Sequence, residues 1–161
     1  MFKYNQSEVL KGIIIYSAGD LTASIILGQA SLLRVLAVMM IGGGLYAWEI
    51  PNYFAWIERK TTYTSLTRQS FMKTLYAFAY FNPIWIARHL FLIYILTGKF
   101  SQISWNLIWI GWQSFFWKIP FSFAGNYIVQ VKLPFKYRFA GSAVLSSLFA
   151  LYYAVSERIF H

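Results

Sequence analysis

The sequence contains no cysteine and few charged residues. Fourteen Lys and Arg and five Asp and Glu make up 12% of its 161 residues, about half the share typical of a soluble domain. Without cysteine there can be no disulfide framework, no thiolate metal site and no cysteine nucleophile, and two histidines are too few for a zinc or haem site. These absences argue against metal and redox chemistry, and we expect no cofactor.

Apolar residues are in excess. They make up 58% of the chain and aromatic residues 21%, more than a single core of this size can bury, so the surplus must face lipid or a large partner surface. We therefore predict an all-α, polytopic transmembrane bundle of four to five membrane helices, some kinked by proline, forming one integral membrane domain. The apolar runs that define the spans cover residues 10–27, 35–57, 75–97, 103–131 and 139–155.

The net charge of +9 is unevenly divided between the loops of this predicted bundle. If all five runs cross, nine Lys and Arg share the side of the N-terminus and three lie on the other side. Such a positive-inside bias assigns the N-terminus to the cytoplasm of a bacterium or the matrix of a mitochondrion. No recognition-helix or base-stacking pattern accompanies the charges, so we expect anionic, cardiolipin-like lipids as partners rather than nucleic acid.

Several polar residues fall at membrane depth, where an ionisable group is costly and indicates a function. The set comprises Lys11, Asp20, Glu49, Asn82, Arg88 and Asn126. Counting from a turn near Gln29 places Lys11 and Glu49 at similar depth, which predicts an ion pair across the first hairpin. The same count finds no partner for Asp20 within that hairpin, which leaves a water-lined cavity, a residue such as Arg88, or a protonated carboxyl. A polar clamp between helices is the favoured interpretation, and the lining of a pore is the alternative.

Two prolines interrupt the apolar runs. Pro83 lies in the middle of the third run and Pro120 within the fourth, and each removes a backbone hydrogen bond and clashes with the preceding turn. We predict a kink at Pro83 and a division of the fourth run at Pro120.

One aromatic stripe and one glycine triplet also stand out. Rings at spacings of four, three and four share one helical face, formed by Trp105, Trp109, Trp112 and Phe116. This face is typical of contact with the membrane interface or a neighbouring subunit, with a stacked pigment, quinone or acyl chain as the alternative. The triplet at residues 42–44 predicts a close approach of two backbones.

The glycine, proline and polar positions form an ordered pattern across nearly the whole chain. Its members are Gly19-Asp20, Arg34, Gly42, Gly44, Tyr53-Phe54, Arg59, Phe81-Asn82-Pro83, Pro120, Asn126-Tyr127, Pro134, Tyr137-Arg138, Phe149 and Tyr152. The pattern resembles that of the Mpv-seventeen and peroxisomal-membrane-protein-twenty-two family. This resemblance implies a helical membrane protein of the mitochondrial inner membrane, with its N-terminus in the matrix, or of the peroxisomal membrane, and it implies a small pore. A bacterial inner membrane is the remaining alternative.

This chain departs from that family at several polar positions. Where the family has Trp, Gln, Gly-Pro and Asp-Gln, the chain has Ile119, Phe123, Ala47-Trp48 and, around the last pair, Ala77 and Phe78. Part of the polar lining that a pore would use is therefore replaced by apolar and aromatic residues. No arrangement of nucleophile, base and acid is evident either, so we expect no enzyme. We predict an architectural or accessory subunit of a larger mitochondrial inner-membrane complex, with other membrane subunits as partners, and a small channel or solute pore as the alternative.

Overall fold

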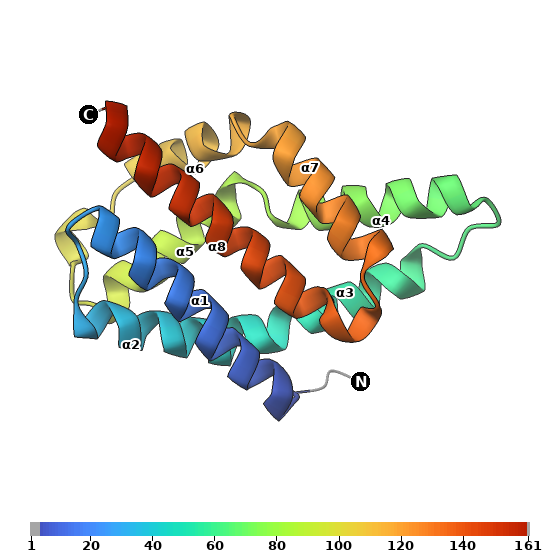
Figure 1. Cartoon of the computed structure of the whole chain (residues 1–161), viewed down its shortest axis with the longest axis horizontal. Helices are drawn as coiled ribbons and strands as arrows, with labels where there is room; N and C mark the ends of the chain where they lie inside the picture. Colours follow the sequence, from blue (N-terminus) through green and yellow to red (C-terminus); the bar gives the residue numbers. More distant parts are fainter. Residues whose placement is uncertain (1–3, 161) are drawn as a thin grey trace. The chain divides into compact units, whose positions relative to one another are not determined.

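A computed structural model of the chain describes residues 4–160, apart from the side chains of Tyr153 and of residues 155–160 (Figure 1). Every regular element in that range is helical, which confirms the all-α prediction. The elements are α1 (Gln6–Ile26), α2 (Leu32–Met40), the π-helix η1 (Ile41–Tyr46), α3 (Ala47–Lys60), α4 (Leu66–Tyr80), α5 (Pro83–Leu96), the 3-10 helix η2 (Phe100–Gln102), α6 (Asn106–Phe116), α7 (Ile119–Tyr127), the π-helix η3 (Ile128–Lys132) and α8 (Phe135–Phe160).

Three stretches of helix are long and apolar enough to cross a membrane: Gln6–Ile26, Leu32–Lys60 and Leu66–Leu96. They are compatible with an integral membrane protein. The predicted fourth run is divided into α6 and α7, of 11 and 9 residues, or about 17 and 14 Å, each shorter than the hydrocarbon core of about 30 Å. The fifth run, residues 139–155, lies inside α8. Four to five spans remain a prediction.

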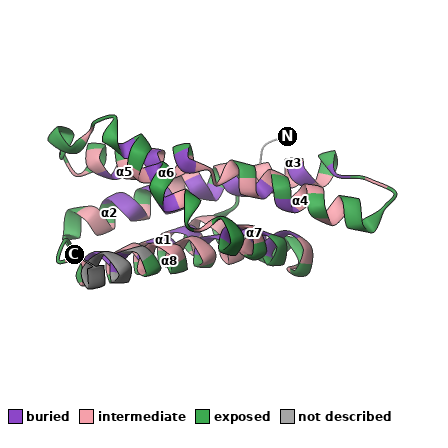
Figure 2. Cartoon of the chain, turned by 90° about the horizontal axis from the view of Figure 1, so that it is seen from above, coloured by how far each residue is buried: buried purple, intermediate pink, exposed green. Residues whose placement is uncertain are grey.

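The predicted third run begins too late. The composition of residues 58–70, the longest polar stretch of the chain, predicts a loop, yet α3 continues to Lys60, α4 starts at Leu66 and only residues 61–65 separate them. Ser65 caps α4 by accepting a hydrogen bond from the backbone of Arg68, and Arg, Gln and Met are good helix formers. The segment is therefore helical although it is polar, and Figure 2 colours much of the ribbon around the α3–α4 loop green, for exposed residues.

The chain divides into two compact units, and the boundaries pass through α3 and α8. Unit 1 comprises Met1–Asn52 and Phe139–His161, and unit 2 comprises Tyr53–Arg138. In unit 1, α1 packs against α2 and η1. A Cβ atom built on Gly42 would lie 2.5 Å from the carbonyl oxygen of Gly12, and one built on Gly12 would collide with the carbonyl of Gly42. The close backbone approach predicted at the glycine triplet is confirmed, with Gly12 as its partner.

Helix α8 contacts α1 within the same unit. A Cβ atom on Gly19 would collide with the side chain of Ser147, and the Ser147 hydroxyl donates a hydrogen bond of 3.2 Å to the carbonyl of Ile15. Small residues on both helices therefore permit this contact, as in other packed membrane helices.

In unit 2, two broken helices pack against each other: α5 against α6, and α4 against α7. The first break lies at Asn82, whose side-chain oxygen caps α5 by accepting from the backbone N–H of Trp85 at 3.0 Å, with Pro83 as the first residue of the helix. The second lies between α6 and α7, where Pro120 occupies the first turn of α7. Proline is compatible with that position because its missing N–H has no helical partner there. Gly111 of α6 approaches the carbonyl of Pro83.

Glycine ends two of the helices. Gly28 after α1 and Gly98 after α5 have φ angles of 68° and 69°. The N–H of the next residue in each case bonds back to a carbonyl five residues earlier, at 2.8 Å. These are Schellman turns, in which the left-handed conformation favours glycine.

Candidate functional site

Asp20 and Arg34 form the best-defined ion pair of unit 1. Arg34 donates from Nε and Nη2 to the two carboxylate oxygens of Asp20, both at 2.7 Å. The side chains are 11% exposed at Asp20 and 13% at Arg34. This geometry is the bidentate one that makes Arg–carboxylate pairs strong.

The prediction that Asp20 has no partner within its own hairpin is therefore wrong. Asp20 lies six residues before the end of α1 and Arg34 two residues after the start of α2, a difference in depth of about 6 Å at 1.5 Å per residue. A depth count between Cα atoms ignores the length of the arginine side chain, which can cover that difference. Arg34 also lies in the first turn of α2, where the helix dipole disfavours a cation, so Asp20 offsets that cost.

The other ionisable residues predicted at membrane depth lie on three different helices. Lys11 binds Glu8 on the preceding turn of α1, at 2.8 Å. Glu49 is partly buried in the first turn of α3, and Arg88 is partly buried on α5. The sequence analysis compared the depth of Lys11 with that of Glu49 and did not consider Glu8, which lies on the same helix as Lys11.

A three-residue ion cluster lies in unit 2. The carboxylate of Glu58, near the end of α3, accepts from Lys73 of α4 at 2.8 Å and from Arg138 of α8. Arg138 is 8% exposed and also donates from Nε to the carbonyl of Leu133 at 3.1 Å. The carboxylate of Glu58 thus joins Lys73 and Arg138, two cations that the charge count placed on the same side of the predicted membrane, the side of the N-terminus.

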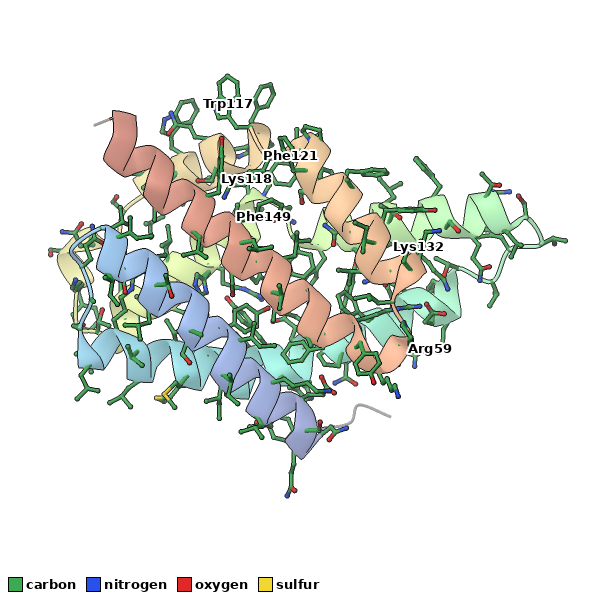
Figure 3. The ribbon with its side chains drawn as sticks, viewed as in Figure 1. Arg59, Trp117, Lys118, Phe121, Lys132 and Phe149 are labelled. Carbon is green, nitrogen blue, oxygen red and sulfur yellow. The ribbon has the colours of Figure 1, made fainter. Side chains whose placement is uncertain are left out.

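Exposed cations lie next to this cluster in the sequence. We call the cluster and these cations together the basic end of unit 2. Arg59 follows Glu58 directly, and Lys132 and Lys136 flank the segment before Arg138 (Figure 3). Lys132 lies 5.8 Å from the centre of the Tyr127 ring, and Lys136 lies 4.7 Å from that of Tyr137. The basic end therefore carries more positive charge than Glu58 neutralises.

Tyr53 and Pro134, two further positions of the pattern that resembles the Mpv-type family, also belong to unit 2. The Tyr53 hydroxyl donates to the carbonyl of Tyr76 at 2.8 Å, and its ring stacks on Tyr80 with centroids 4.5 Å apart. Tyr53 thereby joins α3 to α4 within unit 2. Pro134 lies between η3 and α8, where the carbonyl of Pro134 accepts from the N–H of Tyr137 at 2.9 Å. Tyr53 and Pro134 thus have structural roles.

The aromatic stripe is exposed in the structure. Relative exposures are 85% for Trp105, 60% for Trp109, 54% for Trp112 and 65% for Phe116. Two rings beyond the end of α6, outside this spacing, are also exposed, Trp117 at 78% and Phe121 at 70% (Figure 3). We call these six side chains the aromatic face. The opposite side of α6 is buried and carries Leu107, Gly111 and Ser114.

Asn82 and Asn126 differ in their surroundings. Asn82 caps α5 and donates to the carbonyl of Ala79 at 2.9 Å, which gives it a structural role. Asn126 is 1% exposed and donates to the carbonyl of Ser122 at 2.8 Å. Gln130, which the sequence analysis did not single out, is 0% exposed. Its position four residues after Asn126 is the signal that could have revealed it.

Among the side chains that the structure describes, no three His, Asp or Glu are grouped so that they could hold a metal ion. Comparison of the chain with protein-family models, with curated proteins and with solved structures gives no match.

Proposed function

We propose that the chain is a non-enzymatic integral membrane protein that serves as an accessory subunit of a larger membrane complex and docks through its aromatic face. The observation that carries this proposal is the exposure of at least 54% at each of the six aromatic side chains. Large exposed apolar rings gathered over a short stretch of chain are typical of an interaction surface.

The length of the aromatic face favours a protein partner over the lipid interface. From Trp105 to Phe116 the helix rises about 17 Å, whereas each interfacial zone of a bilayer is only about 5–8 Å deep. Helix α6 packs along α5, which belongs to a candidate span. The rings therefore extend beyond one aromatic belt. Since α6 has no charged residue, the partner surface is apolar, such as the helices of other membrane subunits.

The resemblance to the Mpv-type family and the charge bias support a location in the mitochondrial inner membrane with the N-terminus in the matrix. The replacement of polar family positions by Phe78 and Phe123 supports an architectural role, because both rings lie in a packed aromatic contact between α4 and α7, with centroids 5.8 Å apart. A packed contact of this kind offers no polar lining for a solute.

Blue-native electrophoresis of native membranes, with identification of the co-migrating chains, tests this proposal. We expect the chain to migrate with a larger complex and the double variant Trp109→Ala/Trp112→Ala to be released from it. The matched control is Leu33→Ala/Leu36→Ala on α2, whose side chains are 52% and 47% exposed. Migration of the natural chain only as a monomer or homo-oligomer would refute the proposal.

We also propose that anionic lipids bind at the basic end of unit 2. Lys132 and Lys136 are exposed and held beside tyrosine rings, and each cation near an anionic surface contributes about 1 kcal/mol. Native mass spectrometry should show fewer retained cardiolipin molecules for Lys132→Gln/Lys136→Gln than for the natural chain. Lys99→Gln, which changes an exposed lysine outside this cluster, serves as the control, and equal retention in all three proteins would contradict the proposal.

A small pore is the second candidate, and the paired helix breaks favour it. The break at Asn82 lies between α4 and α5, and the second lies between α6 and α7, the helices that pack against them. Broken helices form the binding sites of many transporters because their ends leave backbone groups available. Purified protein in planar bilayers would then conduct ions or pass small solutes, and silence in both assays would count against a pore.

A further inference from the structure

Three polar side chains form a row on one side of α7 and η3. Ser122, Asn126 and Gln130 follow at spacings of four and are 6%, 1% and 0% exposed. Residues four apart lie on the same helical face, and this stretch packs against α4. The row is about 12 Å long, and it lies inside unit 2.

Several polar atoms of this row are buried and have no hydrogen-bond partner among the described residues. Asn126 uses its amide nitrogen to bond Ser122, but its carbonyl oxygen makes no hydrogen bond to the described residues. Neither the nitrogen nor the oxygen of the Gln130 amide makes one to them either. A buried amide without partners costs about 1–3 kcal/mol by the evidence of mutations, so three such atoms on two residues four apart indicate a ligand that can both donate and accept.

The backbone geometry at Gln130 supports this interpretation. Gln130 lies in η3, a π-helix of five residues. Short π-helical segments are rare and occur frequently at functional sites. In unit 2, therefore, an unusual backbone and unpartnered polar atoms occur at the same position.

The location of the row identifies the ligand and its route of access. Gln130 lies three residues before Leu133, whose carbonyl accepts from Arg138 at the basic end. Thr74 of α4, which is 0% exposed, follows Lys73 of the same cluster. Water is available at that polar end, it donates and accepts hydrogen bonds, and it commonly satisfies buried polar groups of this kind.

We propose that Asn126 and Gln130 form an internal hydration site between α4 and the α7–η3 stretch, which water enters from the basic end of unit 2. The site is independent of docking through the aromatic face, because Asn126 and Gln130 are buried whereas the rings of that face are exposed.

Cysteine labelling tests the proposal directly, since the natural chain contains no cysteine. The single variants Gln130→Cys, Asn126→Cys and Val129→Cys are reconstituted in vesicles and treated with the small cationic reagent methanethiosulfonate ethylammonium. Val129 is the matched control because it neighbours Gln130 and is also buried, at 4% exposure. We expect labelling at positions 130 and 126 to be at least tenfold faster than at 129. Equal rates at 130 and 129, whether fast or slow, would overturn the proposal.

A second variant covers the case in which a cysteine variant does not fold. Gln130→Met removes the amide and nearly keeps the volume. If the amide is hydrated, the midpoint of thermal unfolding stays the same or falls relative to the natural chain. If the amide is dry, its removal relieves an unsatisfied group and raises the midpoint, which would refute the hydration site. The control is Gln113→Met at an exposed glutamine of α6, which shows how far a Gln-to-Met exchange shifts the unfolding midpoint at a position where the amide already contacts solvent or lipid.

Discussion

Removal of one partner from the Asp20–Arg34 pair should destabilise the protein strongly. Arg34→Met takes away both hydrogen bonds of 2.7 Å that the carboxylate of Asp20 accepts. The methionine keeps much of the apolar stem, so the main change is the loss of the charge and the two donors. The carboxylate is then left 11% exposed with its strongest partner gone.

The burial of the pair sets the expected size of this effect. An exposed ion pair contributes about 0–1 kcal/mol, whereas breaking a buried pair costs about 3–5 kcal/mol because a charge remains uncompensated. With side chains 11% and 13% exposed, the pair lies near the buried limit, and we expect Arg34→Met to lower the free energy of unfolding by about 3 kcal/mol. Arg34→Lys keeps the charge but cannot form the two-pronged contact, so we expect about half of that loss.

The measurement is denaturant unfolding in detergent, combined in a double-mutant cycle with Asp20→Asn. The double variant removes both charges and should recover part of the stability, giving a coupling energy of about 2 kcal/mol. Lys99→Met, a change at an exposed lysine, should alter stability by less than about 0.5 kcal/mol. A coupling energy below about 0.5 kcal/mol would show that the pair behaves as a surface pair and would refute the reasoning.

Further predictions concern packing, charge and capping. Gly42→Ala places a methyl group against a neighbouring backbone carbonyl, 2.5 Å away, and should cost about 1–3 kcal/mol. Gly44→Ala, which has open space within 4 Å, should be neutral or stabilising in the same unfolding assay, and equal losses would contradict the contact. Glu58→Gln leaves its two basic partners without their carboxylate and should cost about 1–2 kcal/mol, since Glu58 is partly exposed; an unchanged unfolding midpoint would argue against the cluster. Asn82→Ala removes the cap of α5 and should cost about 1 kcal/mol, whereas Asn82→Asp should largely preserve stability.

The helix breaks were predictable because they depend on local chemistry. Proline removes a backbone donor, and the chain breaks where the sequence predicts a kink at Pro83 and a division of the fourth run at Pro120. Pro51, by contrast, lies inside α3. The boundary of α4 was less predictable. The polarity of residues 58–70 predicts a loop, but capping by Ser65 and good helix formers start α4 at Leu66.

The candidate site was only partly predictable. The helical stripe of Trp105, Trp109, Trp112 and Phe116 follows from spacing alone, and all four side chains are exposed. Trp117 and Phe121 lie outside that spacing. The partner of Asp20 and the role of Gln130 did not follow from spacing. A pair between two helices depends on side-chain reach and on turn geometry, and a buried amide can be recognised only when its neighbours are known.

The sequence by itself determined the helical class, the apolar excess, the charge bias and the prolines that break the helices, because each depends on residue type and local order. The tertiary structure alone decided which charges meet. Glu58 joins Lys73 and Arg138 across 15 and 80 residues, and Gly42 meets the backbone of Gly12. Such contacts depend on how helices distant in sequence pack, since the energy of a pair or a close approach is set by distances that residue order does not contain.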